Sequence, residues 1–460
     1  MEDHSATPAR VLFHQGEQHV DAAAWALAEQ AFRQALALEP GFAEAQANLG
    51  YVRDLQGDSA EAEACYRGAL ELNPDAAVVH LNLGALLARQ KRHTEAEGCY
   101  AAALALEPDS SAVWSNLGAL NLNLQREETA EACLRHAMAL DPTNARPRFN
   151  LAYLQLRRGQ LEEGWSLLEA RSGLALLEQQ IQLPRWQGDS LAGKSLLVVA
   201  EAGHGDTIHF CRYVVWLKEQ GARHISLVCP PALVALLQTL AGVDCIYAYD
   251  EAFDDKAHDD WLPLLSAPGL AHAHGCAQPV GLPYLKSDAE RRKTWATLLP
   301  TAPGLRVGLV WKGNADFEND SDRSLGHFQW LEPLWTVDGL CFVSLQKGNG
   351  EQEPSQCAST QPATEIGPLL NDFADAAAVI DQLDLVISVD TAIAHLAGAL
   401  GKPCWLLLPW YMPDWRWRAQ GNETPWYPGA MRLFRQQSDG DWSGVVQEVT
   451  QALQTHVATA

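Results

Sequence analysis

Prolines recur in the first third of the chain at a fixed interval of 34 residues. A second series, an asparagine followed by leucine, keeps the same period. The positions are Pro40, Pro74, Pro108 and Pro142 for the prolines, and Asn48, Asn82, Asn116 and Asn150 for the asparagines. A fixed period of this length indicates a stacked helical array, in which each unit packs only against its neighbours. Such an array is a binding surface, so catalytic chemistry is expected elsewhere in the chain.

The composition describes a folded chain and argues against polyanionic partners. The 460 residues are 47% hydrophobic and 20% charged, which suits about three folded domains. The formal net charge of −24 would repel nucleic acid over most of the surface. No apolar run could span a membrane, and the N-terminal residues MEDHSATPAR lack a signal-peptide core. We therefore expect no nucleic-acid partner, no membrane insertion and a cytoplasmic location.

The ten cysteines give no metal or redox pattern. There is no Cys-x-x-Cys pair and no zinc-like spacing with histidine. Cys65, Cys99 and Cys133 share one repeat position, as buried packing residues do. We expect reduced structural thiols, no bound metal and no resident cofactor.

Each 34-residue unit reads as two helices with apolar residues at helical spacing, closed by a proline. The pattern resembles the tetratricopeptide repeat. Copies fall at 9–42, 43–76, 77–110 and 111–144, with a degenerate fifth at 145–172. The array is thus expected over residues 1–172, followed by a linker over residues 173–193.

The recurrent asparagine is a functional signal, because asparagine is a mediocre helix former. A side-chain amide has an acceptor and two donors, so it can pair with both N–H and C=O of an extended peptide. The repeats resemble the asparagine ladder of O-GlcNAc transferase, where asparagine precedes a Leu-Gly pair. This implies a protein or peptide acceptor held by Asn48, Asn82, Asn116 and Asn150. An inter-repeat hydrogen bond or a consensus feature of the repeat is the alternative.

The pattern changes after the linker to short apolar runs that alternate with helices, which is typical of a parallel sheet with crossover helices. The expected strands are 195–200, 224–229, 306–311, 341–346, 383–388 and 404–409. A Pro- and Gly-containing break near 287–305 divides this part into domains at 194–300 and 301–460. Two facing Rossmann-like domains of this kind form the GT-B fold.

Three stretches resemble the lipopolysaccharide heptosyltransferases. Gly205-Asp206-Thr207-Ile208-His209 is similar to their Gly-Asp-x-x-His segment, and the run 200–213 is similar to bacterial proteins that join tetratricopeptide repeats to such a transferase. VGLVWKGN (307–314) resembles the strand that opens their nucleotide-binding half. The run 388–395 is similar to their Asp-Thr-Gly-x-x-His motif, with Ala392 where glycine is usual.

The third stretch provides the expected donor site. Asp390, Thr391, Ala392 and His395 follow a strand and open a helix, where α/β sheets bind ligands and where free N–H groups favour a phosphate. Further donor-binding residues are expected at strand ends and in the loop beyond. They are Lys312, Arg323, Gln346 and Lys347. Cations here would offset leaving-group charge without a metal. A helix cap with a half-buried histidine, and solvated surface cations, are the structural alternatives.

Asp206 is the expected general base. The glycines Gly203 and Gly205 let the backbone approach an acceptor sugar or hydroxyl closely, and the resemblance assigns the matching aspartate this role. His204 and His209 are alternatives, because imidazole transfers protons near neutral pH. A purely structural N-cap role for Asp206 is also possible on this pattern.

Other segments are less specific. The aromatic run around 409–417 and 426–428 fits either a base-binding wall or the packing of a domain edge. Asp-x-Asp triplets occur at 320–322 and 439–441, in loops of the second half, and we do not expect them to bind metal. The C-terminal run from Asp441 reads as a helix, which the resemblance implies would cross back to the first half.

These features together imply a metal-independent, inverting glycosyltransferase that uses a nucleotide sugar and a protein acceptor. Relatives with this organisation imply a Ser or Thr hydroxyl on flagellin or another surface protein. A glycan- or lipid-linked acceptor is the first alternative. A non-catalytic repeat scaffold is the second, favoured only by Ala392, and a nucleotide-sugar epimerase is a distant third.

Overall fold

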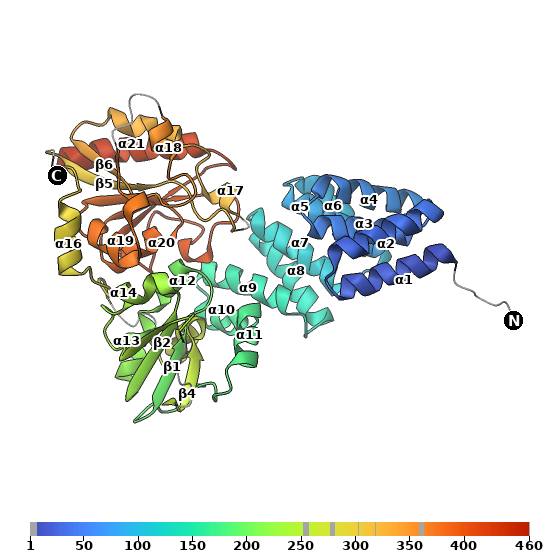
Figure 1. Ribbon diagram of the computed structural model, residues 1–460, viewed down its shortest axis with the longest axis horizontal. Helices are drawn as coiled ribbons and strands as arrows, with labels where there is room; N and C mark the ends of the chain where they lie inside the picture. Colours follow the sequence, from blue (N-terminus) through green and yellow to red (C-terminus); the bar gives the residue numbers. More distant parts are fainter. Residues whose placement is uncertain are drawn as a thin grey trace. The chain divides into compact units, whose positions relative to one another are not determined.

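The computed structural model divides into two compact units, residues 1–150 and 151–460 (Figure 1). The structure describes residues 7–251, 257–276, 281–301, 303–317, 319–357 and 363–459. None of the described helices is long and apolar enough to cross a membrane.

The first unit consists of paired antiparallel helices. They are α1 (Pro8–Asp21), α2 (Trp25–Leu38), α3 (Ala43–Leu55), α4 (Ser59–Leu72), α5 (Ala77–Arg89), α6 (His93–Leu106), α7 (Ser111–Asn123) and α8 (Glu127–Leu140). Glycine is required inside these pairs, because a Cβ on Gly84 would lie 2.6 Å from the Tyr100 ring. Gly118 faces Leu134 in the same way, at 2.7 Å. The predicted helical repeat is therefore confirmed, with small residues where paired helices touch.

Three further helices follow, α9 (Ala145–Arg158), α10 (Leu161–Leu168) and α11 (Ser172–Gln180). Helix α9 begins in the first unit and ends in the second. Helix α10 packs against α15 (Ala267–Ala273), and Leu174 of α11 joins a cluster with strand residues of the first sheet. The segment 161–180 is thus built into the second unit.

The second unit contains two parallel sheets. Among the described residues the first has the order β3 (Cys245–Ala248), β2 (His224–Cys229), β1 (Ser195–Val199), β4 (Asp260–Pro263). The second has the order β10 (Met431–Arg435), β9 (Cys404–Leu408), β8 (Leu385–Val389), β5 (Leu305–Val310), β6 (Leu340–Ser344), β7 (Thr364–Glu365). Two parallel-sheet α/β domains confirm the predicted fold class, and the arrangement fits the GT-B plan.

Crossover helices connect the strands in both halves. They include α12 (His204–Phe210), α13 (Tyr213–Glu219), α14 (Val234–Leu237), α16 (Ala289–Ala296), α17 (Asp320–Arg323), α18 (Glu353–Gln356), α19 (Phe373–Ile380) and α20 (Ala392–Ala399). The halves touch where α12 packs on α20 and α16 packs on α19. Figure 1 shows α12, in green, beside α20, in orange. Each of these contacts joins a helix of the first half to one of the second.

The C-terminal helix α21 (Trp442–Thr459) is present as predicted, but its expected crossing is wrong. It packs on the 3₁₀ segment η4 (Phe328–Thr336) and on the second sheet, where Trp442, Val446 and Leu453 are buried. Its apolar stripe matches the core of the second half, which explains why it stays there.

Candidate functional site

The candidate site lies where α12 meets α20, at the carboxyl ends of β1 and β8. In open α/β sheets this edge is where ligands bind. The approach is very close, because a Cβ on Gly205 would lie 2.9 Å from His395 Cδ2 and 3.6 Å from Ala392 Cα. The two sequence stretches that carried the resemblance are therefore in direct contact.

Arg416 lies at the centre of this contact and is only 4% exposed. Its Nη2 donates to Asp206 Oδ1 at 2.5 Å, and its Nε donates to His209 Nδ1 at 2.9 Å. Its Nη1 donates to both carboxylate oxygens of Asp414 at 3.0 Å. The guanidinium therefore joins two residues of α12 to the segment that carries it in the second half.

His209 is fully buried and neutral. Burial, with the positive charges of Arg212 and Arg416, lowers the pKa of His209 well below its usual range. Since a guanidinium always donates, His209 Nδ1 accepts and its ring proton sits on Nε2. That Nε2 has no hydrogen-bond partner among the described residues. The geometry favours a supporting role for His209 over proton transfer to a substrate.

The remaining base candidates lie at the N-terminus of α12. Asp206 is 28% exposed at its side chain, and its Oδ2 accepts from the Gly203 N–H at 3.1 Å. His204 is exposed, with its ring 5.2 Å from that of Phe373, and partial desolvation lowers its pKa. Asp206 therefore combines access to solvent with a fixed orientation.

Asp390, Thr391 and His395 are brought together at the end of β8. Asp390 accepts from Trp417 Nε1 at 2.7 Å and lies 4.0 Å from His395 Nε2. Burial, reinforced by the negative charge of Asp414, raises the pKa of Asp390. His395 pairs with Tyr427 Oη at 2.8 Å, and burial lowers its pKa well below the usual range. Thr391 caps α20 without a side-chain cap bond.

A second buried cation, Arg212, also bridges the halves. Its Nη1 donates to the Trp426 carbonyl at 2.9 Å, and its Nη2 donates to Tyr284 Oη at 2.9 Å. Its guanidinium lies over the rings of Tyr284 and Tyr427. The buried charge of Arg212 is thus stabilised by a backbone carbonyl, a phenol oxygen and the faces of two aromatic rings.

Three other predicted donor-binding residues already use their polar groups in bonds within the protein. Lys312 Nζ pairs with Glu353, and Lys347 Nζ donates to the Leu370 carbonyl at 2.6 Å. The Gln346 amide is used within the protein, since its Oε1 accepts from the Trp311 and Lys312 N–H groups and its Nε2 donates to two carbonyls. Gln346 therefore shapes the loop backbone, whereas the exposed Lys347 could change partner.

Arg323 lies on α17, in the loop beyond β5. Its guanidinium covers the half-exposed ring of Phe317, 4.4 Å from the centroid, and contacts Asp320 at 3.3 Å. Its charge acts on Asp390 across the carboxyl edge of the sheet. Arg323 therefore faces the same region as Asp390, Thr391 and His395, which form the Asp390 cluster.

The aromatic run packs the domain interface. Trp415, Trp417, Trp426 and Tyr427 are all nearly fully buried. Trp417 stacks on His395 with ring centroids 5.3 Å apart. Packing, the second of the two interpretations, applies to these four side chains. Asp414 and Arg416 lie within this run but were not predicted as site residues. The charged Arg416 between two tryptophans was the sequence feature that could have indicated them.

The asparagine series lies on successive first helices of the repeats, at Asn48 on α3, Asn82 on α5, Asn116 on α7 and Asn150 on α9. All four are half-buried. Among the described residues, none forms a hydrogen bond with these side-chain amides. The alternative of an inter-repeat hydrogen bond is therefore not seen.

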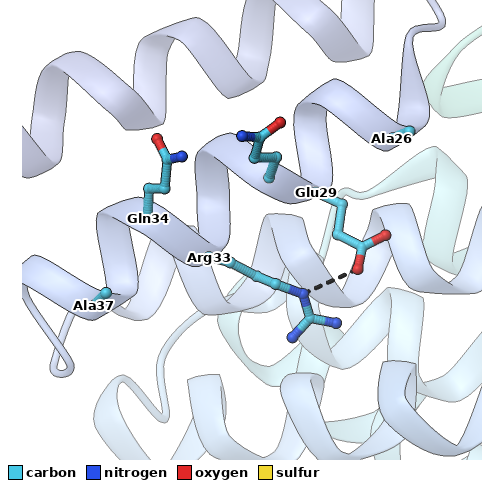
Figure 2. Close-up of a pocket in the computed structure, with 6 residues that line it drawn as sticks. Ala26, Glu29, Arg33, Gln34 and Ala37 are labelled. Carbon is cyan, nitrogen blue, oxygen red and sulfur yellow. Dashed lines mark hydrogen bonds and ion pairs between the residues drawn. The ribbon is translucent and has the colours of Figure 1, made fainter.

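A shallow pocket lies elsewhere on the repeats, along α2 (Figure 2). Its lining residues are Ala26, Glu29, Gln30, Arg33, Gln34 and Ala37. Figure 2 shows Arg33 turned toward Glu29, with which it forms an ion pair at 2.9 Å. This pocket contains none of the predicted site residues.

Within the described ranges, no three His, Cys, Asp or Glu side chains group as metal ligands would. The ten cysteines are all free thiols. Burial raises the pKa of several, including Cys65 and Cys133 of the repeats. Those two are packing residues at the repeated position, as the sequence indicated.

Models of two protein families match separate parts of the chain. Sequence models of the tetratricopeptide repeat match residues 13–77, 53–111, 81–145 and 133–165. The model of glycosyltransferase family 9 (heptosyltransferase) matches residues 339–406. The N-terminal part therefore carries tetratricopeptide repeats, and the C-terminal match spans β6 to β9 with the Asp390 cluster.

A curated relative is Protein FlbA of Caulobacter vibrioides, 29% identical over 335 residues. The match covers 66% of this chain and 54% of that protein, so the chain spans about half the length of its relative.

Two solved structures are similar to part of the chain. PilW, a type IV pilus biogenesis factor, has 20% identity and a TM-score of 0.35 over 41% of this chain and 83% of its own. Pseudomonas aeruginosa pilF has 23% identity and a TM-score of 0.34 over 40% and 79%.

Proposed function

We propose that this protein is a glycosyltransferase that moves a sugar from a nucleotide-sugar donor to a protein acceptor held by its repeats. The match of residues 339–406 to glycosyltransferase family 9 carries this proposal. The contact between α12 and α20 supports it, because Asp206 on the acceptor side then lies close to the Asp390 cluster on the donor side.

The proposed reaction is a direct displacement. An acceptor hydroxyl oxygen forms a bond to the anomeric carbon while the bond from that carbon to the phosphate oxygen breaks. Asp206 takes the hydroxyl proton, and the nucleoside phosphate leaves with the bonding electrons. Arg323, Lys347 and the N–H groups that open α20 would stabilise the leaving phosphate, so no metal is required. Attack opposite the leaving group inverts the anomeric centre.

The amides of Asn48, Asn82 and Asn116, which have no hydrogen-bond partner among the described residues, support a polypeptide acceptor. Half-buried amides that form no hydrogen bond within the protein would gain hydrogen bonds to a bound peptide backbone. No existing hydrogen bond of the fold would have to break. A Ser or Thr hydroxyl of flagellin or another surface protein is the acceptor that we propose. A glycan-linked acceptor would leave these amides without a role.

Thermal unfolding with UDP, GDP, ADP, CMP and CDP, each with and without a divalent metal, tests the donor site. A ligand at ~100 times its dissociation constant adds about 2.7 kcal/mol to the stability of the domain that binds it. We expect one nucleotide to stabilise the protein without metal, and Lys347→Ala to weaken that effect. Lys293→Ala, at an exposed position on α16, is the matched control. No response to any nucleotide would favour the non-catalytic scaffold.

A further inference from the structure

We propose that Arg416 is a positioning residue for Asp206, and that the fifth repeat holds Arg416 in place through Trp165. This repeat, residues 145–172, would then form part of the transferase site. The inference rests on the proposed function and names residues that the repeat and transferase motifs do not contain.

The first step is the geometry of Arg416. Each guanidinium nitrogen is used: Nε on His209, Nη2 on Asp206 and Nη1 on Asp414. A planar fork with all its nitrogens engaged has one orientation. Asp206 is held at its other oxygen by the Gly203 N–H. The Asp206 carboxylate is therefore oriented from both sides.

The second step is the support of Arg416 itself. Its guanidinium carbon lies 4.5 Å from the centroid of Trp415 and 5.0 Å from that of Phe210. Those two rings are stacked on each other with centroids 6.4 Å apart. Aromatic faces at these distances attract a cation and limit its movement.

A side chain of the fifth repeat packs on the two rings that support Arg416. Trp165 on α10 packs edge-on against both supporting rings, with centroid distances of 5.4 Å to Trp415 and 6.2 Å to Phe210. It is 5% exposed and also contacts Trp426 at 6.1 Å. A single repeat side chain therefore touches rings from both halves of the transferase.

Electrostatics agree with this placement. Burial opposes the charge on Arg416, whereas the carboxylates of Asp414 and Asp206 raise the pKa of its guanidinium. The two carboxylates therefore offset the burial of this cation, and the fifth repeat supports Arg416 through the packing of Trp165.

A double-mutant cycle in the full-length protein tests the link between Arg416 and Asp206. Arg416→Lys keeps the charge but cannot reach all three acceptors. We expect kcat to fall about 100-fold, the effect of a small misplacement of a reacting group, with the nucleotide dissociation constant unchanged. In the Asp206→Asn background, Arg416→Lys should lower kcat no further, because the two residues act as one unit. Multiplicative losses would show that Arg416 acts independently and would overturn the proposal.

A second pair of variants tests the fifth repeat. Trp165→Leu should lower kcat while the donor KM stays unchanged, and Trp165→Phe should lower it less. Trp186→Leu is the control, since Trp186 is 2% exposed and packs on Trp216 in the first half, 6.0 Å away. It should reduce stability and leave kcat as in the wild type. Wild-type kcat in Trp165→Leu would overturn the role of the repeat.

These results separate the inference from the proposed function. If the wild type binds no nucleotide and transfers no sugar, both are wrong. If the wild type is active and the double-mutant cycle is multiplicative, only the role of Arg416 is wrong.

Discussion

Gly205 and His395 are in such close contact that no side chain fits between them. A Cβ on Gly205 would lie 2.9 Å from Cδ2 of the His395 ring. Both residues belong to sequence stretches selected for chemistry, yet this contact also packs one half of the transferase on the other. This one pair of residues is therefore constrained both by packing and by the candidate site.

Gly205→Ala should destabilise the second unit by about 1–3 kcal/mol, because an added methyl in a closely packed contact forces side chains out of position. It should also lower transfer, since α12 carries Asp206. Gly98→Ala is the control: Gly98 lies inside α6 with nothing within 4 Å of an added Cβ. That change should stabilise its helix by up to about 1 kcal/mol. Chemical denaturation measures both, and equal effects would contradict the prediction.

Acidification below pH ~6.5, the usual pKa of histidine, should destabilise the second unit. The pKa values of His209 and His395 are lowered by burial, so only the unfolded state takes up protons there. Each histidine should contribute up to about 1.4 kcal/mol of lost stability per pH unit below that point. Unfolding measured from pH 8 to 5 should become less pH-dependent in His209→Gln, which keeps an acceptor for Arg416. Identical pH slopes in variant and wild type would rule out a neutral, buried His209.

Asn82→Ala combined with Asn116→Ala should raise the KM for a protein acceptor. Each lost hydrogen bond to a peptide is worth about 1 kcal/mol, so the rise should be on the order of tenfold or more. Stability should not fall, because neither amide bonds to any of the described residues. Donor hydrolysis in the absence of acceptor should also be unchanged.

The control for the asparagine pair is Gln30→Ala with Gln34→Ala, in the α2 pocket of Figure 2. These amides lie on another helix of the array and should not affect the acceptor KM. If the two double variants behave alike, the amides of the ladder do not hold the acceptor.

Arg171→Met should cost about 3–5 kcal/mol of stability, because removing one partner of a buried ion pair leaves the other charge buried and unpaired. Arg171 forms a bidentate ion pair with Glu201: its Nη2 donates to Oε1 at 2.7 Å and its Nε donates to Oε2 at 2.9 Å. Both side chains are almost completely buried. The exposed pair Lys293–Glu290 is the contrast, where Lys293→Met should cost about 1 kcal/mol or less. A smaller loss in Arg171→Met plus Glu201→Met than in the single variant would identify the unpaired carboxylate as the cause.

Much of the fold could be predicted from the sequence, because period and strand patterning are local signals. All six predicted strands are present, within a residue or two of their expected ends. The missed strands are short or interrupted by polar residues: β3, β4, β7 and β10. In β10 the sequence MRLFR places arginines between apolar residues, and only pairing with β9 identifies it as a strand.

The site was predictable where a motif carried it and not where packing created it. Asp206, Asp390 and His395 were selected from their motifs; His395 lies beside Asp390, and Gly205, the neighbour of Asp206, contacts His395. Gln346 was selected for its position at a strand end, but its amide is used on neighbouring backbone groups. Arg416 lies 210 residues from Asp206 in the chain, and no local pattern shows that pairing.

The packing of α10 on α15 and of α11 on the first sheet has a consequence for protein engineering. A chimera that exchanges the repeats at residue 172 would remove Trp165 and Arg171 from an interior that they fill. An exchange within α8 or the turn before α9 would leave those contacts in the recipient. To change acceptor specificity, the first four repeats alone should therefore be exchanged, and the fifth should stay with the transferase domains.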